Sequence, residues 1–321
     1  MTETAPYFAD LAQGPEGGEA YWLTTSDGVR IRVGLWPLKT TQAGAKGTVF
    51  ILPGRTECVE KYGRAAADFA ARGFASLAID WRGQGIADRL LKDRRIGHVE
   101  EFQDYQKDLD AVMALVENLT EEHAMPKPWF LIGHSMGGAI GIRALIEGKP
   151  FQAAGFSAPM WGIGLTPVQK LLLRFVSPVL HALGLQNLRA PGTKPETYMI
   201  WHGFKDNLLT SDREMFDYMT DQVVAQPDLG LGGPSSHWVT EAIRENDWAF
   251  EHALPDVPVM CFLGGDEKIV NTQAVKDLAT RWPSCELVIV PGARHEVPME
   301  TPATRALFYD RLATLFEQSA P

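Results

Sequence analysis

The sequence predicts an α/β protein: a mostly parallel sheet flanked by helices, with a helical insertion in its second half. Three observations predict this class. Short runs rich in β-branched and aromatic residues alternate with longer amphipathic stretches in the first half of the chain, a proline-broken helical stretch follows, and the alternation then returns. Because parallel strands need crossover connections, this alternation indicates parallel strands with helices on both faces.

The elements are expected in a definite order. A β-hairpin opens the chain, formed by residues 21–25 and 29–36 and joined at Asp27-Gly28, a pair typical of tight turns. The expected strands are 48–52, 75–79, 129–132, 257–263 and 285–290. The expected helices between and after them are 65–72, 102–119, 139–147, 273–281 and 304–317.

The alternation lapses from about Ser157 to about Asn246. This stretch is helical in pattern and is broken by six prolines, at positions 167, 178, 191, 195, 227 and 234. One sheet interrupted by an insertion is the simplest account. It gives a first part of the core at 1–156, a helical cap or lid at 157–250, and a second part of the core at 251–321.

Composition narrows the function classes. The chain has 321 residues with 30 Lys and Arg against 40 Asp and Glu, a net charge of −10, and 45% hydrophobic residues, so it is expected to fold as a globular protein and not to bind nucleic acid. Its three cysteines show no metal spacing, and no metal or other cofactor is expected. The odd thiol and the lack of a long apolar run or signal-like start predict a cytoplasmic protein without a transmembrane segment.

A nucleophile motif follows the strand at 129–132. Gly133-His134-Ser135-Met136-Gly137 has the form G-x-S-x-G, and a helix begins at once. Small residues flank Ser135 because the reversal from strand to helix is tight, and a Cβ at Gly133 or Gly137 would collide with nearby backbone. The turn exposes the hydroxyl and points the first helix amides to where an oxyanion would form.

A serine nucleophile needs a base and an orienting carboxylate, which for this motif follow in the chain order serine, acid, histidine. His295 lies in the loop after the last expected strand, and Asp266 and Glu267 lie in the loop after the strand before it. Both loops follow the carboxyl ends of strands, where open parallel sheets place their sites. These three pieces predict a catalytic triad.

With these motifs the chain resembles an α/β-hydrolase, and among them the serine lipases of the monoacylglycerol lipase and lysophospholipase L2 type. The segments that carry the resemblance are 53–57, 80–85, 133–137, 264–270 and 295–296. The resemblance implies that Ser135 is the nucleophile and His295 the base, and that the amides of Arg55 and Met136 form the oxyanion hole. It implies cleavage of a monoacyl lipid ester, a monoacylglycerol or a lysophospholipid, through an acyl-enzyme.

The residue that serves as the triad acid and the chemical class of the acyl donor both stay open. Relatives follow the pattern G-x-x-D-x-x-V, and counting from Gly264 puts Glu267 at the acid position with Val270 in register, whereas Asp266 stands one residue early. Glu267 is therefore favoured, since either carboxylate orients a histidine. Fold and triad leave thioesterase, peptidase and perhydrolase activities open, as well as a non-catalytic binding homologue.

Three polar residues near these motifs have two readings each. The guanidinium of Arg55 either contacts a substrate phosphate or pairs with Glu57 or Glu60. His134 either packs beneath the nucleophile turn, which is favoured, or titrates in the reaction. His237 either touches substrate or has a structural role.

The stretch 163–183 is unusually apolar for a solvated cap. Leu172, Phe175, Val176 and Val179 share one face of a helix. The face either packs on the core or forms an acyl-chain tunnel or a lid that transiently contacts lipid aggregates. Leu172 and Phe175 are thus candidate substrate contacts. The basic run at residues 89–95 is expected on a solvated helix face.

Overall fold

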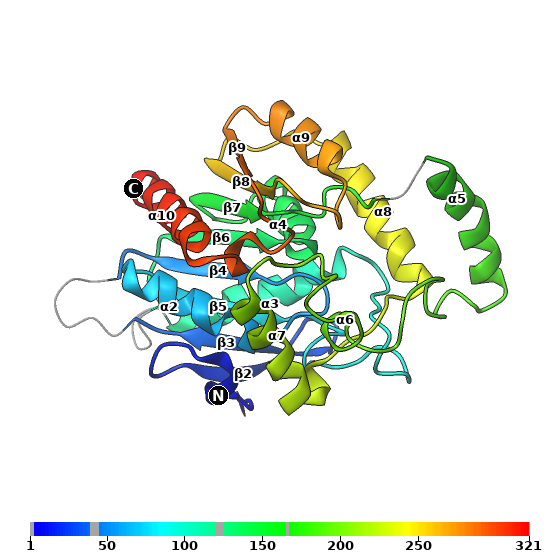
Figure 1. Ribbon diagram of the computed structural model, residues 1–321, viewed down its shortest axis with the longest axis horizontal. Coiled ribbons are helices and arrows are strands. Elements are labelled where there is room, and N and C mark those ends of the chain that lie inside the picture. The colour runs from blue at the N-terminus through cyan, green and yellow to red at the C-terminus, as the bar shows by residue number, and fades with distance from the viewer. Residues whose placement is uncertain (1–2, 39–44, 120–124, 165–166, 321) are drawn as a thin grey trace.

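The computed structural model describes residues 3–38, 45–119, 125–164 and 167–320, with residues 167–174 as backbone alone (Figure 1). Within these residues one nine-stranded sheet forms the centre, in the order β1-β2-β3-β5-β4-β6-β7-β8-β9. The strands are β1 (Glu3–Thr4), β2 (Glu19–Thr24), β3 (Arg30–Trp36), β4 (Thr48–Leu52), β5 (Ala75–Asp80), β6 (Trp129–His134), β7 (Ala153–Ser157), β8 (Val259–Gly264) and β9 (Cys285–Val290).

Strand directions divide the sheet. The hairpin of β2 and β3 is antiparallel and joins β5 antiparallel, whereas the pairs from β5 through β4, β6, β7 and β8 to β9 are all parallel. The predicted hairpin and the mostly parallel sheet are therefore confirmed. The order of the strands reverses at β4, which lies between β5 and β6, and open sheets bind ligands outside the carboxyl ends of strands at such a point.

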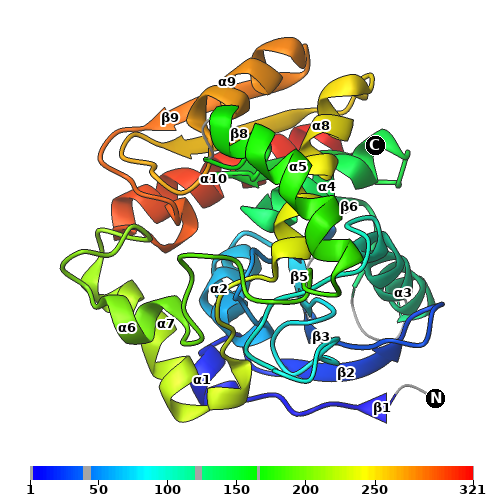
Figure 2. The same cartoon turned by 90° about the vertical axis from the view of Figure 1, so that its right-hand side faces the viewer.

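Helices cover both faces of the sheet (Figures 1 and 2). Their bounds are α1 (Ala9–Ala12), α2 (Gly63–Ala71), α3 (Asp104–Leu119), α4 (Met136–Ile146), α9 (Thr272–Arg281) and α10 (Pro302–Ser319), with short 3-10 turns at η1 (Val59–Tyr62) and η3 (Val297–Met299). Alternate residues of β4 belong to opposite layers: Val49 and Ile51 pack with α2 and α10, and Phe50 and Leu52 pack with α3 and α4. This two-sided burial explains the continuous apolar runs of the central strands.

In the part of the chain that the structure describes, four helices lie between β7 and β8. They are α5 (Pro167–Ala182), α6 (Tyr198–His202), α7 (Arg213–Ala225) and α8 (Ser236–Glu251), with η2 (Pro227–Leu229) after α7. α8 packs on the core through Trp238 and Ala242. α7 docks on the N-terminal segment, where the hydroxyl of Tyr218 donates to the carbonyl of Ala12 at 2.7 Å. α5 contacts α8 and stands at the outside of the molecule (Figure 1).

Some features differ from the sequence expectations. β7 was not predicted, because Ala-Ala-Gly-Phe-Ser lacks β-branched residues; the segment is a strand because it is hydrogen-bonded and buried between β6 and β8. Residues 89–95 form no helix, so the expected helix face for this basic run is wrong. None of the helices in the described ranges is long and apolar enough to cross a bilayer.

Candidate active site

β6 turns directly into α4 at Ser135. This residue has φ 48° and ψ −115°, a positive φ that side-chain-bearing residues rarely adopt. Three backbone hydrogen bonds hold it: its amide donates to the carbonyl of Ser157 at 3.1 Å, and its carbonyl accepts the amides of Gly138 at 2.9 Å and Met160 at 2.8 Å. Such a conformation costs about 1–3 kcal/mol and persists only where the surroundings fix it.

Two glycines make room for this turn. A Cβ on Gly137 would lie 1.9 Å from the carbonyl oxygen of Leu52, and one on Gly133 would lie 2.7 Å from the carbonyl oxygen of Gly137. The first turn of α4 therefore presses against the end of β4. As a result, the loop that begins after Leu52 and contains Arg55 lies next to Ser135.

His295 and Glu267 meet at the ends of two neighbouring strands. Nδ1 of His295 lies 2.7 Å from Oε2 of Glu267, and the two side chains are 4% and 0% exposed. The other carboxylate oxygen accepts the amides of Ile269 at 2.5 Å and Val270 at 3.2 Å. Burial opposes ionisation of Glu267, but the hydrogen bond from His295 and these two amides outweigh it and lower its pKa.

Asp266, the other candidate acid, is exposed. Its amide donates to the carbonyl of Ala293 at 2.9 Å, which turns this residue to the outer side of the loop. The structure therefore brings Glu267, and not Asp266, into contact with His295.

Ser135 and His295 line one cavity of about 390 Å³. This volume is typical of small-molecule sites. Most of the wall is apolar and is made by Met160, Ile163, Met199, Leu208, Leu209, Met219, Val239, Ile269 and Val270. The charged lining groups are Arg55, Glu57, Lys61 and Glu296. An apolar wall beside a serine and a histidine suits a substrate with an apolar part and a polar group.

Comparison with known proteins assigns the fold and the family. Residues 43–302 match the family described as serine aminopeptidase, S33. The chain belongs to this family. It is also 30% identical over 295 residues to lysophospholipase L2 of Escherichia coli strain K12, covering 84% of this chain and 80% of that one. Monoglyceride lipase of Saccharomyces cerevisiae is 23% identical over 280 residues, covering 84% of each chain.

Solved structures agree on the fold. A soluble variant of the Saccharomyces cerevisiae monoglyceride lipase, in complex with a substrate analogue, superimposes with a TM-score of 0.71 at 20% identity, covering 93% of this chain and 95% of that one. Monoacylglycerol lipase of Paleococcus ferrophilus gives a TM-score of 0.64 at 17% identity, covering 90% and 98%. The predicted α/β-hydrolase fold is confirmed.

Two backbone amides of this α/β-hydrolase are free to donate a hydrogen bond to a ligand. Met136 is the first residue of α4, and Arg55 follows β4. Among the described residues, no acceptor receives the amide of either one. Free amides at a helix start and in an adjoining loop are the donors that an oxyanion hole uses.

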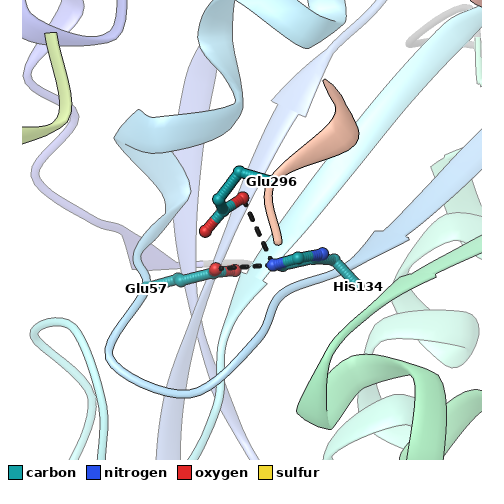
Figure 3. Close-up of side chains that lie close together, drawn as sticks. All are labelled: Glu57, His134 and Glu296. Carbon is teal, nitrogen blue, oxygen red and sulfur yellow. Dashed lines mark ion pairs between the residues drawn. The ribbon is translucent and has the colours of Figure 1, made fainter. Parts of the chain in front are cut away.

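A buried charge cluster lies beneath the serine. Figure 3 shows Glu57, His134 and Glu296 directed toward one another. Nε2 of His134 lies 3.4 Å from Oε1 of Glu57 and 3.2 Å from Oε2 of Glu296, and it forms a hydrogen bond to neither carboxylate. Its Nδ1 lies 3.0 Å from the carbonyl of Ser157, to which it donates. Lys61 Nζ lies 2.6 Å from both Glu57 and Glu296.

The two carboxylates shift the pKa values of the basic groups in this cluster. Burial opposes protonation of His134, but the two carboxylates outweigh it and raise its pKa above 6.5. The same carboxylates raise the pKa of Lys61 against the effect of burial. Glu57, His134 and Glu296 have the ligand atoms that could hold a metal ion. Because Lys61 already pairs with both carboxylates, a divalent cation would have to displace it.

Two of the three remaining candidate contacts, Phe175 and His237, lie apart from the Ser135 cavity. The side chain of Leu172 lies outside the described residues. Phe175 is 70% exposed and is not part of the cavity wall. His237 lines a different cavity and its Nε2 lies 2.7 Å from the carbonyl oxygen of Glu100. The structure thus does not bring Phe175 or His237 to Ser135.

The sequence reasoning missed Lys61 and Trp238. Lys61 stands four residues after Glu57, a spacing that favours an ion pair and could have signalled the cluster. Trp238 lines the cavity from the first turn of α8, capped by the Ser235 side chain. A serine before an amphipathic stretch signals a helix start, but not which cavity that helix lines.

Proposed function

We propose that this protein is a serine hydrolase that cleaves the carboxylic ester of a monoacyl lipid, a monoacylglycerol or a lysophospholipid, through an acyl-enzyme. Ser135 is the nucleophile, His295 the base and Glu267 the orienting acid. The observation that carries the proposal is that His295, hydrogen-bonded at 2.7 Å to an ionised carboxylate, lines the same cavity as a serine held on a strained turn.

The proposed reaction follows from these positions. Glu267 accepts the Nδ1 proton of His295, which leaves Nε2 unprotonated and able to take the proton of the Ser135 hydroxyl. The Oγ attacks the ester carbonyl, and the carbonyl electrons move to its oxygen. The amides of Arg55 and Met136 stabilise this oxyanion.

Collapse of the first intermediate completes acylation. The carbon–oxygen bond of the leaving alcohol breaks, and His295 gives that alcohol its proton. Water then attacks the acyl-enzyme, with His295 accepting a proton from water and returning it to Ser135. The products are a free fatty acid and glycerol or a glycerophospho-alcohol.

Two findings support a lipid substrate. The cavity wall is mostly apolar, as an acyl chain requires, and the matched relatives include a lysophospholipase L2 and monoglyceride lipases. An exposed apolar patch on α5 and the loop after it, including Phe175 (70% exposed), Val179 (56%) and Leu183 (65%), supports transient contact with lipid aggregates. All three cysteines are free thiols, which supports the cytoplasm as its compartment.

A peptidase is the second candidate, because the family description names an aminopeptidase. Peptide and ester substrates react by the same steps, so only the leaving group distinguishes them. A panel of p-nitrophenyl esters, monoacyl lipids and aminoacyl p-nitroanilides therefore decides between the two. Turnover of the anilides without turnover of the lipids would favour the peptidase.

The central test is Ser135→Ala. It should lower ester hydrolysis by several orders of magnitude and abolish labelling by a fluorophosphonate, since the triad acts as a unit. Ser157→Ala is the matched control, because Ser157 is a buried neighbour whose hydroxyl has no hydrogen-bond partner among the described residues. More than a tenth of the original turnover in Ser135→Ala would exclude this nucleophile.

A further inference from the structure

The guanidinium of Arg55 has no role in the reaction proposed above, which uses only the backbone amide of this residue. Arg55 lines the cavity together with Ser135 and His295. Its Nη1 donates to the carbonyl of Gly232 at 2.8 Å, and its guanidinium carbon lies 5.8 Å from the centre of the Trp238 ring. These contacts fix the side chain in the wall of the cavity.

The glutamates nearest in sequence are engaged elsewhere. Glu57 accepts from Lys61 at 2.6 Å and from the hydroxyl of Tyr62 at 2.5 Å. Glu60 is paired with Arg32 at 2.7 Å, where both side chains are fully buried. Within the described ranges the structure forms no ion pair to Arg55, so the alternative of pairing with Glu57 or Glu60 is wrong.

Arg55 is thus a cation with donors left over. A guanidinium has five N–H donors, and among the described residues only Nη1 of this one reaches a protein acceptor. Burial without a carboxylate lowers the pKa of Arg55 to about 10, so it stays charged at neutral pH. Arg55 is only partly buried, but removing even part of an unpaired charge from water costs free energy, which a ligand anion in the cavity would offset.

We propose that Arg55 binds the phosphate of a monoacyl phospholipid whose ester carbonyl lies at Ser135, an inference that rests on the proposed function. The amide of Arg55 then contacts the oxyanion on the acyl carbon, and its guanidinium contacts the phosphate at the other end of the glycerol unit that joins the two. A planar guanidinium matches a phosphate with two parallel hydrogen bonds. The apolar wall holds the acyl chain, and a neutral monoacylglycerol leaves the cation unpaired.

The test compares two substrates with the same acyl chain, a lysophosphatidylcholine and a monoacylglycerol. Arg55→Met keeps the backbone amide and removes the charge. It should lower the ratio of kcat/KM for the phospholipid to that for the monoacylglycerol by about ten- to a hundredfold, the value of a charge-assisted hydrogen bond, mainly through KM. Arg55→Lys should restore part of the ratio, because charge returns without the planar fork.

Arg94→Met is the matched control. Its side chain is 55% exposed, so the same charge is removed far from the cavity wall and the ratio should not change. An unchanged ratio in Arg55→Met, or an equal loss on both substrates, would overturn the phosphate assignment. Failure of the proposed function would give a different result: the wild-type protein would be inactive on both lipids, or activity would survive in Ser135→Ala.

A binding measurement tests the site without turnover. On the Ser135→Ala background, titration with a non-hydrolysable 1-O-alkyl ether of lysophosphatidylcholine should show binding that Arg55→Met weakens about ten- to a hundredfold. A 1-O-alkylglycerol of equal chain length is the neutral control ligand. If inorganic phosphate alone binds as tightly as the ether lipid, Arg55 is a site for free phosphate and the lipid assignment is wrong.

Discussion

Replacing Glu267 by glutamine tests the proposed triad most directly, because the structure fixes how the new side chain would sit. One carboxylate oxygen accepts two amides, from Ile269 at 2.5 Å and Val270 at 3.2 Å. Those amides need an oxygen, so the carbonyl of the glutamine would take this place. Its NH₂ group would then face Nδ1 of His295, where Glu267 now accepts at 2.7 Å.

This exchange reverses the histidine tautomer. Two donors cannot face each other, so Nδ1 of His295 would lose its proton and Nε2 would carry it. A protonated Nε2 cannot accept the proton of Ser135. The corresponding change in a serine protease lowers kcat about 10⁴-fold with the geometry intact, and we expect a loss of about 10³–10⁴-fold in Glu267→Gln.

The assay is kcat/KM for p-nitrophenyl butyrate at pH 7 to 8, with the melting temperature as a check on folding. Asp266→Asn is the matched control, since it makes the same chemical change one residue away on an exposed side chain. It should stay within about twofold of wild type, as surface changes usually do. A loss below tenfold in Glu267→Gln, or an equal loss in Asp266→Asn, would refute the reasoning.

Three further predictions concern stability and substrate length. Lys61→Met removes a buried ion pair and should lower the free energy of unfolding, measured in urea, by about 3–5 kcal/mol. Lys46→Met, the control, removes an ion pair whose side chains are both about half exposed and should cost at most about 1 kcal/mol. Equal losses in the two variants would contradict this prediction. Because the pKa of Glu296 is lowered from 4.5, the free energy of unfolding should fall as the pH falls below 4.5. An unfolding free energy that stays constant below pH 4.5 would exclude this contribution of Glu296. Val239→Trp should shorten the preferred acyl chain of p-nitrophenyl esters, unlike the exposed control Val224→Trp; identical profiles would remove Val239 from the acyl path.

The sheet was predictable because most of its strands have a recognisable local sequence pattern. Central strands such as β4 are buried on both faces and read as continuous apolar runs, and Gly133 and Gly137 mark the tight turn at Ser135. β7 was not predicted because four of its five residues are small and none is β-branched. Its burial comes from the neighbouring strands β6 and β8 and not from its own composition. The limits of the predicted insertion stay a prediction, and α8 within it packs on the sheet.

The candidate site was predictable where chain order and motif determine it. Counting within the loop favours Glu267, and the structure brings this carboxylate to His295, although its role stays a prediction. His237 and Phe175 could not be placed, because helical periodicity gives a face but not the cavity that the face lines. Lys61 was missed for a related reason, since its second partner, Glu296, is distant in sequence.

The charge cluster explains how three separate loops hold a common geometry. His134 precedes Ser135 and Glu296 follows His295, while Glu57 lies two residues after Arg55 and joins the same group. Each proposed reacting segment thus contributes one ionisable neighbour to one buried cluster, and Lys61 binds the two carboxylates at 2.6 Å. Moving the Glu57 or the Glu296 loop would separate a buried carboxylate from Lys61, which costs several kcal/mol. The cluster therefore positions the serine, the histidine and the Arg55 loop relative to one another without itself entering the proposed reaction.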